Sequence, residues 1–337
     1  MRAVAYKIPQ PISAETSLID VDLPVPEAIG HDLLVEIKAV SVNPVDVKVR
    51  AHSAPPADEV KILGWDAAGI VKAVGPDVTL FRPGDEVYYA GAINRPGTNA
   101  EFHLVDERIV GRKPKSLGFA AAAALPLTSI TAYEALFDRL KVRDAVPGAA
   151  RALLVIGGAG GVGSIAIQIA RALTDLTVIA TASRPETQVW VKELGAHHVV
   201  DHSKPIAPQV AALGIGAPGF IFSTTNTDSH IAGIVEAIAP QGRFALIDDP
   251  TFLDVVPFKR KAVSVHWELM FTRALFSTPD MIEQHNLLNK VAELVDAGKI
   301  RTTLSQTVGA INAANLRKAH SMIESGRMKG KAVLAGF

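Results

Sequence analysis

Residues 152–163 read ALLVIGGAGGVG, an apolar run that passes directly into a glycine-rich turn. The run predicts a buried strand. Apolar side chains then recur at the i, i+3, i+4, i+7 spacing of one helix face, at Val162, Ile165, Ala166, Ile169, Ala170 and Leu173. The glycines therefore mark the point where a strand passes into a helix.

A turn of this kind, with Gly158, Gly160 and Gly163 in a G-x-G-x-x-G string, predicts a dinucleotide-binding site. The glycines allow a tight turn, close approach of the backbone to a pyrophosphate, and close packing of helix on strand. The helix N-terminus adds unpaired N–H groups and a partial positive charge. We expect the pyrophosphate to be bound by Gly158, Ala159, Gly160, Gly161, Val162 and Gly163. The alternative is a glycine-rich turn that binds no ligand.

The choice of cofactor is predicted from the end of the next strand, at 176–182. A site that prefers NAD usually carries Asp or Glu there, about twenty residues after the glycines, to bind the ribose 2′-hydroxyl. This chain has Ser183 and Arg184 instead. A guanidinium donates to a phosphate, so this pair favours NADP(H). Alternatively, Arg184 is an ordinary solvated loop arginine, since Pro185 follows it.

Composition is that of a globular protein of two domains, because 337 residues exceed what one core normally organises. Lysine plus arginine and aspartate plus glutamate number 34 each, so no global field favours nucleic acid or an anionic membrane. The N-terminus lacks the apolar core of a signal peptide, and no stretch approaches twenty apolar residues. We therefore expect a cytoplasmic protein that acts on small molecules, without a nucleic-acid or membrane partner.

The chain contains no cysteine. This excludes disulfides, thiolate nucleophiles and every cysteine-based zinc or iron–sulfur site.

Two patterns divide the sequence near residue 125. Before it, short β-branched or aromatic runs such as 33–37, 68–75 and 86–89 are separated by turn signals, which predicts an antiparallel, barrel-like region. After it, strands alternate with helices, which predicts a doubly wound parallel sheet of six strands, at 152–156, 176–182, 198–200, 219–223, 243–247 and 262–265. Residues 330–334 look like a final strand that returns to the first domain.

Several further motifs carry a family resemblance, in the order SVNPVD 41–46, GWDAAGIV 64–71, FRPGDEVY 81–88, LTSITAYEAL 127–136, GGAGGVG 157–163, KELGA 192–196 and GKAVL 330–334. With these motifs the chain resembles the medium-chain dehydrogenase/reductases, and within them the zinc-free quinone oxidoreductases and the zinc-type alcohol dehydrogenase-like proteins. The resemblance implies an α/β protein with a GroES-like β-barrel catalytic domain (1–125 and 268–337) and a Rossmann NADP(H)-binding domain (126–267), with the active site between them. It also implies a homodimer.

The chain departs from the zinc alcohol dehydrogenases at the metal ligands. Asn43 and Pro44 stand where those enzymes have a cysteine ligand and a histidine, and Trp65 stands at the histidine ligand, followed by Asp66. The cysteines of the structural zinc lobe are missing too. We therefore expect no zinc. The histidines at 197, 198 and 202 are expected to be surface residues rather than ligands.

The resemblance also gives candidate site residues, each with a purely structural alternative. Asn43 is placed to donate to a substrate oxygen or line the nicotinamide pocket, unless Asn43-Pro44 is only a turn. Asp46 and Asp66 either orient Asn43 or a water, or are caps and solvated charges.

Thr131 approaches the nicotinamide in the family, or else it caps or packs a helix. Lys331 matches a basic residue near the cofactor phosphates, or is a solvated lysine. Four apolar residues are candidates for a wall against a flat substrate. We expect at most two of them to contact substrate and the others to pack the core: Trp65, Tyr88, Met270 and Phe271.

Without a Lewis acid, reduction of a simple carbonyl loses several kcal/mol of assistance. A quinone or conjugated enone needs less help, so the predicted reaction is metal-free hydride transfer from NADPH to a quinone or an α,β-unsaturated carbonyl. Two alternatives stay open. One is a metal-dependent alcohol or carbonyl oxidoreductase with unusual ligands such as Asp46, Asp66 and a histidine. The other is an NADPH-binding sensor or structural protein without turnover.

Overall fold

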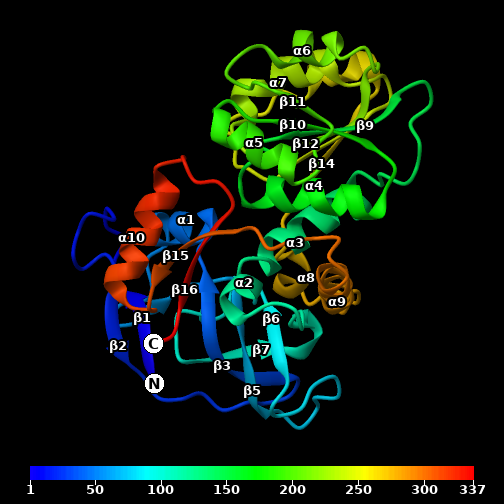
Figure 1. The fold of residues 1–337 in the computed structure, drawn as a ribbon. Helices are drawn as coiled ribbons and strands as arrows, with labels where there is room; N and C mark the ends of the chain where they lie inside the picture. Colours follow the sequence, from blue (N-terminus) through cyan, green and yellow to red (C-terminus); the bar gives the residue numbers. More distant parts are fainter. The chain divides into compact units, whose positions relative to one another are not determined.

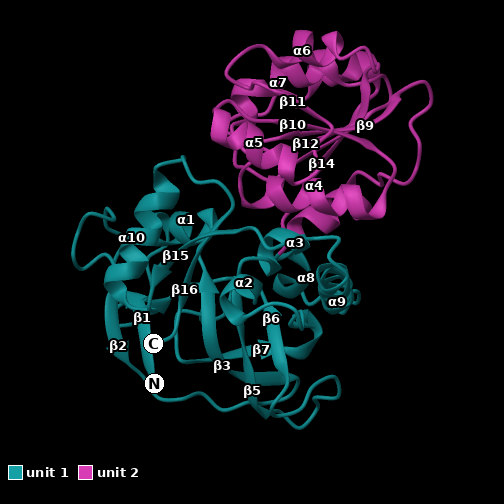
Figure 2. Ribbon diagram, in the orientation of Figure 1, with its two compact units in different colours: residues 1–130, 271–337 teal, residues 131–270 magenta.

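The structure is a computed structural model that describes residues 1–337. The chain forms two compact units: unit 1 comprises residues 1–130 and 271–337, and unit 2 comprises residues 131–270 (Figure 2). The boundaries predicted from sequence lie at 125/126 and 267/268, and the chain passes between units a few residues later at both places.

Unit 1 is built mainly of antiparallel sheet. Its elements are β1 (Arg2–Tyr6), β2 (Ile19–Asp22), β3 (Asp32–Ser41), α1 (Pro44–His52), β4 (Lys61–Ile62), β5 (Ala67–Val74), β6 (Glu86–Tyr89), β7 (Phe102–Asp106), η1 (Glu107–Ile109), β8 (Val110–Arg112), α2 (Phe119–Ala123), α3 (Pro126–Tyr133, crossing into unit 2), α8 (Thr272–Leu275), α9 (Glu283–Asp296), β15 (Leu304–Gly309), α10 (Ala313–Glu324) and β16 (Lys331–Ala335). A seven-stranded sheet contains β15-β16-β3-β5-β6-β8 in that order, with β7 also paired to β3, and a smaller sheet has the order β2-β1-β4. The final strand therefore returns to the first domain, as the sequence predicts, and there it pairs antiparallel with β3.

Unit 2 is a parallel six-stranded sheet between helices, and the predicted α/β fold class is confirmed. Its elements are the π-helix η2 (Glu134–Arg139), β9 (Ala150–Ile156), α4 (Gly161–Leu173), β10 (Thr177–Thr181), α5 (Pro185–Glu193), β11 (His198–Val200), α6 (Ile206–Ala212), β12 (Pro218–Ser223), α7 (Thr227–Ala237), β13 (Arg243–Leu246), η3 (Val256–Lys261) and β14 (Ser264–Trp267). The strand order is β11-β10-β9-β12-β13-β14. The order reverses between β9 and β12, and in such sheets a dinucleotide binds outside the carboxyl ends of the strands at this point.

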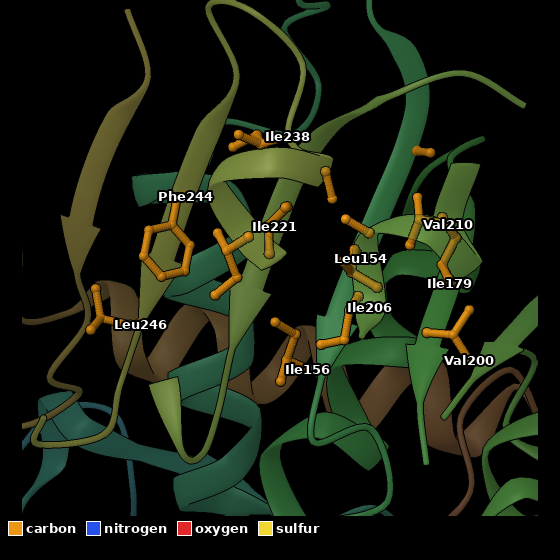
Figure 3. Packing of buried hydrophobic residues seen from close by; sticks show 14 of the residues in the cluster. Leu154, Ile156, Ile179, Val200, Ile206, Val210, Ile221, Ile238, Phe244 and Leu246 are labelled. Carbon is orange, nitrogen blue, oxygen red and sulfur yellow. The ribbon is translucent and has the colours of Figure 1, made fainter. Parts of the chain in front are cut away.

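The core of unit 2 follows from the alternation of side chains along its strands. Helices α6 and α7 cover one face of the sheet and α4 and α5 cover the other (Figure 1). On the first face, side chains such as Leu154, Ile156, Ile221 and Phe244 pack into one apolar cluster (Figure 3). Because successive strand residues point to opposite faces, the apolar run of β9 is buried on both sides. This explains why the strand reads as a continuous hydrophobic stretch.

One helical stretch, Phe119–Arg139, is long enough and apolar enough to cross a membrane. Most of it is packed inside the protein, since 78% of its most apolar window is buried. It has the character of a core helix.

Candidate functional site

The glycine-rich turn lies at the strand-order reversal of unit 2. Strand β9 ends at Ile156, Gly157 takes φ +78°, and α4 begins at Gly161 with Gly160 as its N-cap. The turn is fastened to the end of β10, because the Gly157 N–H donates to Thr181 Oγ1 at 3.0 Å and the Gly158 N–H donates to the Thr181 carbonyl at 3.1 Å. No side chain caps α4. Its first-turn N–H groups and its dipole therefore provide an anion site.

The three motif glycines differ in how much room a side chain would have. A Cβ on Gly163 would lie 2.3 Å from the Gly157 carbonyl oxygen, and one on Gly158 would lie 2.9 Å from Ala180 Cβ. Packing alone thus explains these two glycines. It does not explain Gly160, whose φ of −68° suits any residue and whose added Cβ would meet only one atom, at 3.5 Å. At the second glycine of such a motif, the absence of a side chain lets the backbone come close to a pyrophosphate, and Gly160 has open space around it.

Ser183 and Arg184 follow β10 and are half-buried. Arg184 is the N-cap residue of α5, and its backbone N–H donates to Thr187 Oγ1. Its guanidinium Nε lies 3.1 Å from Glu186 Oε1, and both side chains are substantially exposed. A bound 2′-phosphate would compete with a solvated carboxylate for this guanidinium. The assignment of these two residues to the 2′-phosphate stays a prediction.

His202, expected from the sequence to be a surface residue, is half-buried at this edge of the sheet. Thr181 Oγ1 accepts from the Gly157 N–H and also lies at hydrogen-bonding distance, 2.9 Å, from His202 Nδ1. Burial lowers the pKa of His202, and the charge of Arg184 lowers it further. The sequence does place His202 just after the strand at 198–200, and in this architecture ligands bind at the carboxyl ends of strands. Of the three clustered histidines expected at the surface, only His197 is exposed.

A buried polar cluster forms in unit 1 from Asn43, Asp66 and Lys331, which the adjacent strands β3, β5 and β16 bring together. The Lys331 ammonium lies 2.9 Å from Asp66 Oδ2, donates to the Val42 carbonyl at 3.1 Å, and contacts Asn43 Oδ1. The other oxygen of Asp66 accepts the Leu127 N–H, at the start of α3, at 2.8 Å. Burial raises the pKa of Asp66, and Lys331 opposes this rise.

The side chain of Asn43 is hydrogen-bonded within the protein. Its Oδ1 accepts from Lys331, and its Nδ2 donates to Asp66 Oδ2 at 2.9 Å, with longer contacts to the carbonyls of Ser41 and Trp65. The side chain is only 1% exposed. Because its donors and acceptor are engaged inside the protein, it holds the cluster together and has no donor left for a substrate oxygen.

Asp46 serves as a helix cap. Its Oδ2 accepts the Asn43 backbone N–H at 2.7 Å, which closes a capping box at the start of α1. Burial raises the pKa of Asp46 to about 7. The carboxyl group thus orients Asn43 through its backbone, which combines two of the roles considered from the sequence.

Lys331 is a buried residue in this structure. A solvated lysine or a ligand of the cofactor phosphates needs an accessible ammonium, but this side chain is 3% exposed and its donors reach three protein oxygens. The contacts make it the counter-ion of Asp66. These contacts depend on the pairing of the final strand with β3, which the sequence does not show.

The aromatic residues proposed as a substrate wall are packing residues in the structure. Trp65 is buried, donates its indole N–H to the Ala92 carbonyl at 3.2 Å, and meets Phe271 edge to face with ring centroids 6.1 Å apart. Tyr88 is fully buried and donates its hydroxyl to the Leu288 carbonyl. Met270 is buried as well. Thr131 is buried on α3, one turn after Leu127, and its approach to a nicotinamide stays a prediction.

The residues at this cluster do not suit zinc. Asn43 and Trp65 replace two ligand positions, and an ammonium already neutralises the Asp66 carboxylate from 2.9 Å. No group of three or more histidine, cysteine, aspartate or glutamate side chains comes together that could hold a metal. Zinc prefers thiolate and imidazole ligands in tetrahedral sites, and neither is present here.

Comparison with known proteins agrees with this architecture. A model of the alcohol dehydrogenase GroES-like domain matches residues 30–126, and a model of the zinc-binding dehydrogenase family matches residues 194–334. A zinc-type alcohol dehydrogenase-like protein of Staphylococcus aureus is 41% identical over 316 residues, 92% of each chain. The chain belongs to the medium-chain dehydrogenase/reductase superfamily. It is an oxidoreductase of that superfamily, for which a pyridine nucleotide cofactor is expected.

Two solved structures of such dehydrogenase/reductases cover the whole chain. A putative zinc-dependent alcohol dehydrogenase protein from Rhizobium etli is 69% identical, with a TM-score of 0.99 over 100% of this chain and 98% of the other. A quinone oxidoreductase from Coxiella burnetii is 26% identical, with a TM-score of 0.79 over 100% and 99%. The word zinc in these names refers to those proteins. In this chain no group of side chains that could hold a metal comes together.

Proposed function

We propose that this dehydrogenase/reductase transfers hydride from NADPH to a quinone or to the alkene of an α,β-unsaturated carbonyl, without a metal. The observation that carries the proposal is the buried Lys331–Asp66 ion pair, which also binds Asn43, the residue that stands where the zinc enzymes of the family have a cysteine ligand. The likeness to a quinone oxidoreductase supports the same acceptor class.

The chemistry follows from which groups are available. When bound, the nicotinamide supplies the hydride. The turn at Gly160 and the start of α4 would hold the pyrophosphate, as the open space there allows. The buried ion pair fixes the start of α3 through Leu127, and this orders the helix that carries Thr131. No protein Lewis acid is required, because an extended acceptor spreads the charge that hydride addition creates.

The test is oxidation of NADPH, followed by absorbance, with chelator-treated protein and three acceptors: a naphthoquinone, an alkenal and a simple aldehyde. Turnover of the quinone or alkenal supports the proposal. Activity on the aldehyde alone, restored by added zinc, would overturn the metal-free reaction. Cofactor binding without oxidation by any acceptor would favour the sensor or structural role.

Replacing Arg184 with alanine is expected to weaken NADPH binding and leave NADH binding nearly unchanged, because only NADPH carries the 2′-phosphate. Loss of one charge-assisted hydrogen bond costs about 1.5–3 kcal/mol, or roughly ten- to a hundredfold in Kd. Titration of cofactor fluorescence with both nucleotides measures the ratio. The exposed Arg82 of unit 1, replaced with alanine, is the control and should leave both affinities unchanged. Equal weakening for NADPH and NADH would remove Arg184 from the 2′-phosphate site.

We also propose a homodimer that uses the free edge of β14. This strand is the last of the six-stranded sheet, and Trp267 and Leu269, in and after it, are 53% and 52% exposed. An unpaired edge with exposed apolar side chains favours pairing with a second copy. Sedimentation velocity decides the point: a dimer that Trp267→Glu dissociates is expected, and a monomer at all concentrations contradicts it.

A further inference from the structure

A second buried cluster of charged groups lies in unit 2. Glu134 begins the π-helix η2, and Glu268 directly follows β14. The two residues are only 1% and 3% exposed. Arg139, at the end of the same helix, donates its Nε–H to Glu268 Oε2 at 2.8 Å. The interior of the unit thus holds two buried carboxyl groups, and one of them pairs with this guanidinium.

Hydrogen bonding requires a proton in this cluster. Glu268 Oε1 is buried and has no hydrogen-bond partner. Glu134 lies within hydrogen-bonding reach of the Glu268 carboxyl. Ionised carboxylates only accept, so one of the two must be protonated for a bond between them. A single shared proton satisfies the bond and leaves one carboxylate to pair with Arg139.

The pair lies where the chain enters and leaves the unit. Unit 2 begins at Thr131 and ends at Met270, so Glu134 is three residues after the entry and Glu268 is two before the exit. The Glu268 backbone N–H also donates to the Leu246 carbonyl, at the carboxyl end of β13. That edge of the sheet is the one at which nucleotides bind in such folds.

We propose that Glu134 and Glu268 hold one proton between them, and that this proton joins the entry and exit segments of the nucleotide-binding unit, so that alkaline solution loosens the unit and weakens nucleotide binding. The stability part of the proposal needs no cofactor. The binding part rests on the nucleotide site proposed above.

The other charged groups near the pair do not account for an alkaline transition. His266, on β14, has its pKa lowered by burial and by the charges of Arg139, Arg243 and Lys141. It is therefore neutral throughout the alkaline range. Arginine stays protonated under all these conditions. Lys261 of η3 has a lowered pKa too, but it is present in every variant compared.

The direction of the pH effect follows from linkage. Burial and Glu134 raise the pKa of Glu268 to about 8, against the opposing effect of Arg139. An unfolded glutamate titrates near about 4.3. Between these values the folded protein binds a proton that the unfolded chain has lost, so stability falls as pH rises and levels off above about 8. Glutamine keeps the shape of a protonated carboxyl and has a donor, so E268Q and E134Q should each abolish this decline.

The experiment compares melting temperatures of the wild type, E134Q, E268Q and the double variant from about pH 5 to about pH 9. Each single variant is expected to gain stability relative to the wild type as pH rises. E134Q keeps the Glu268 carboxylate that pairs with Arg139, whereas E268Q and the double variant lack it, so these two should be less stable than E134Q. Glu236, exposed on α7, provides the control E236Q, which should follow the wild type throughout. Single variants that decline in parallel with the wild type would overturn the shared proton.

NADPH affinity is measured over the same pH range. The wild-type Kd is expected to rise with pH, and the Kd of each single variant should rise less. A pH-independent wild-type Kd, together with the expected melting curves, would overturn the link to the nucleotide site. Failure of every acceptor to oxidise NADPH would refute the proposed reaction and leave the melting test unaffected.

Discussion

Replacement of Lys331 with methionine is expected to lower the free energy of unfolding by about 3–5 kcal/mol, because Asp66 would become a buried carboxylate without its cation. Asp66 is 0% exposed, so water cannot take the place of the ammonium without opening the sheet. Denaturant unfolding measures the loss. The double variant Asp66→Asn with Lys331→Met should recover much of it, since no buried charge remains unpaired.

The pH dependence provides a second check on Lys331→Met. Removing the ammonium raises the pKa of Asp66 further above its ordinary range, because Lys331 opposes the effect of burial. A raised folded-state pKa makes stability fall as pH rises. The difference between wild type and variant should therefore be larger at neutral pH than in acid, where a protonated Asp66 needs no counter-ion.

The matched control is Lys38→Met. Lys38 pairs with Glu36, but the two side chains are 35% and 29% exposed. An exposed pair contributes about 0–1 kcal/mol, so this variant should be nearly as stable as the wild type. An equally small effect of Lys331→Met would show that the buried pair is not what holds the cluster.

The second large effect is expected at the glycine-rich turn, where two substitutions by alanine should separate folding from binding. Gly163→Ala should destabilise unit 2, because its Cβ would lie 2.3 Å from the Gly157 carbonyl oxygen. Gly160→Ala should fold normally, since its nearest atom is 3.5 Å away. It should nevertheless weaken NADPH by roughly tenfold or more, because a methyl group would displace a phosphate that accepts charge-assisted hydrogen bonds.

Calorimetry and cofactor titration on the same two variants make the comparison. Gly118→Ala, which meets no atom within 4 Å, controls for the general effect of replacing a glycine. Unchanged NADPH affinity in a folded Gly160→Ala variant would mean that the open space at the start of α4 is not the pyrophosphate site.

Local features of the chain account for much of what could be predicted. The change from strand to helix at 152–173 can be predicted from the sequence, because glycines in a turn and the spacing of apolar residues depend only on neighbouring positions. The six alternating strands fall close to their predicted positions for the same reason. The final strand was recognisable, but sequence alone does not show which strand it joins, so the buried partners of Lys331 could not be predicted.

Roles that depend on partners far along the chain were not predictable. Asn43 and Lys331 are separated by 288 positions and meet only because β16 lies beside β3. Through that contact the amide of Asn43 bonds to both Lys331 and Asp66, and the ammonium of Lys331 becomes the counter-ion of Asp66. Likewise, Glu134 and Glu268 lie far apart in the sequence and become a pair only in the folded unit, where Glu268 follows β14.

The sequence by itself determined the class of fold, the parallel nucleotide-binding sheet and the position of its glycine-rich turn, since each rests on patterns within a few residues. Only the tertiary structure decided the protonation, burial and hydrogen-bond partners of the polar side chains. The physical reason is that a charge in the interior is set by whichever groups the strands place against it, at distances of about 3 Å, and not by its neighbours along the chain.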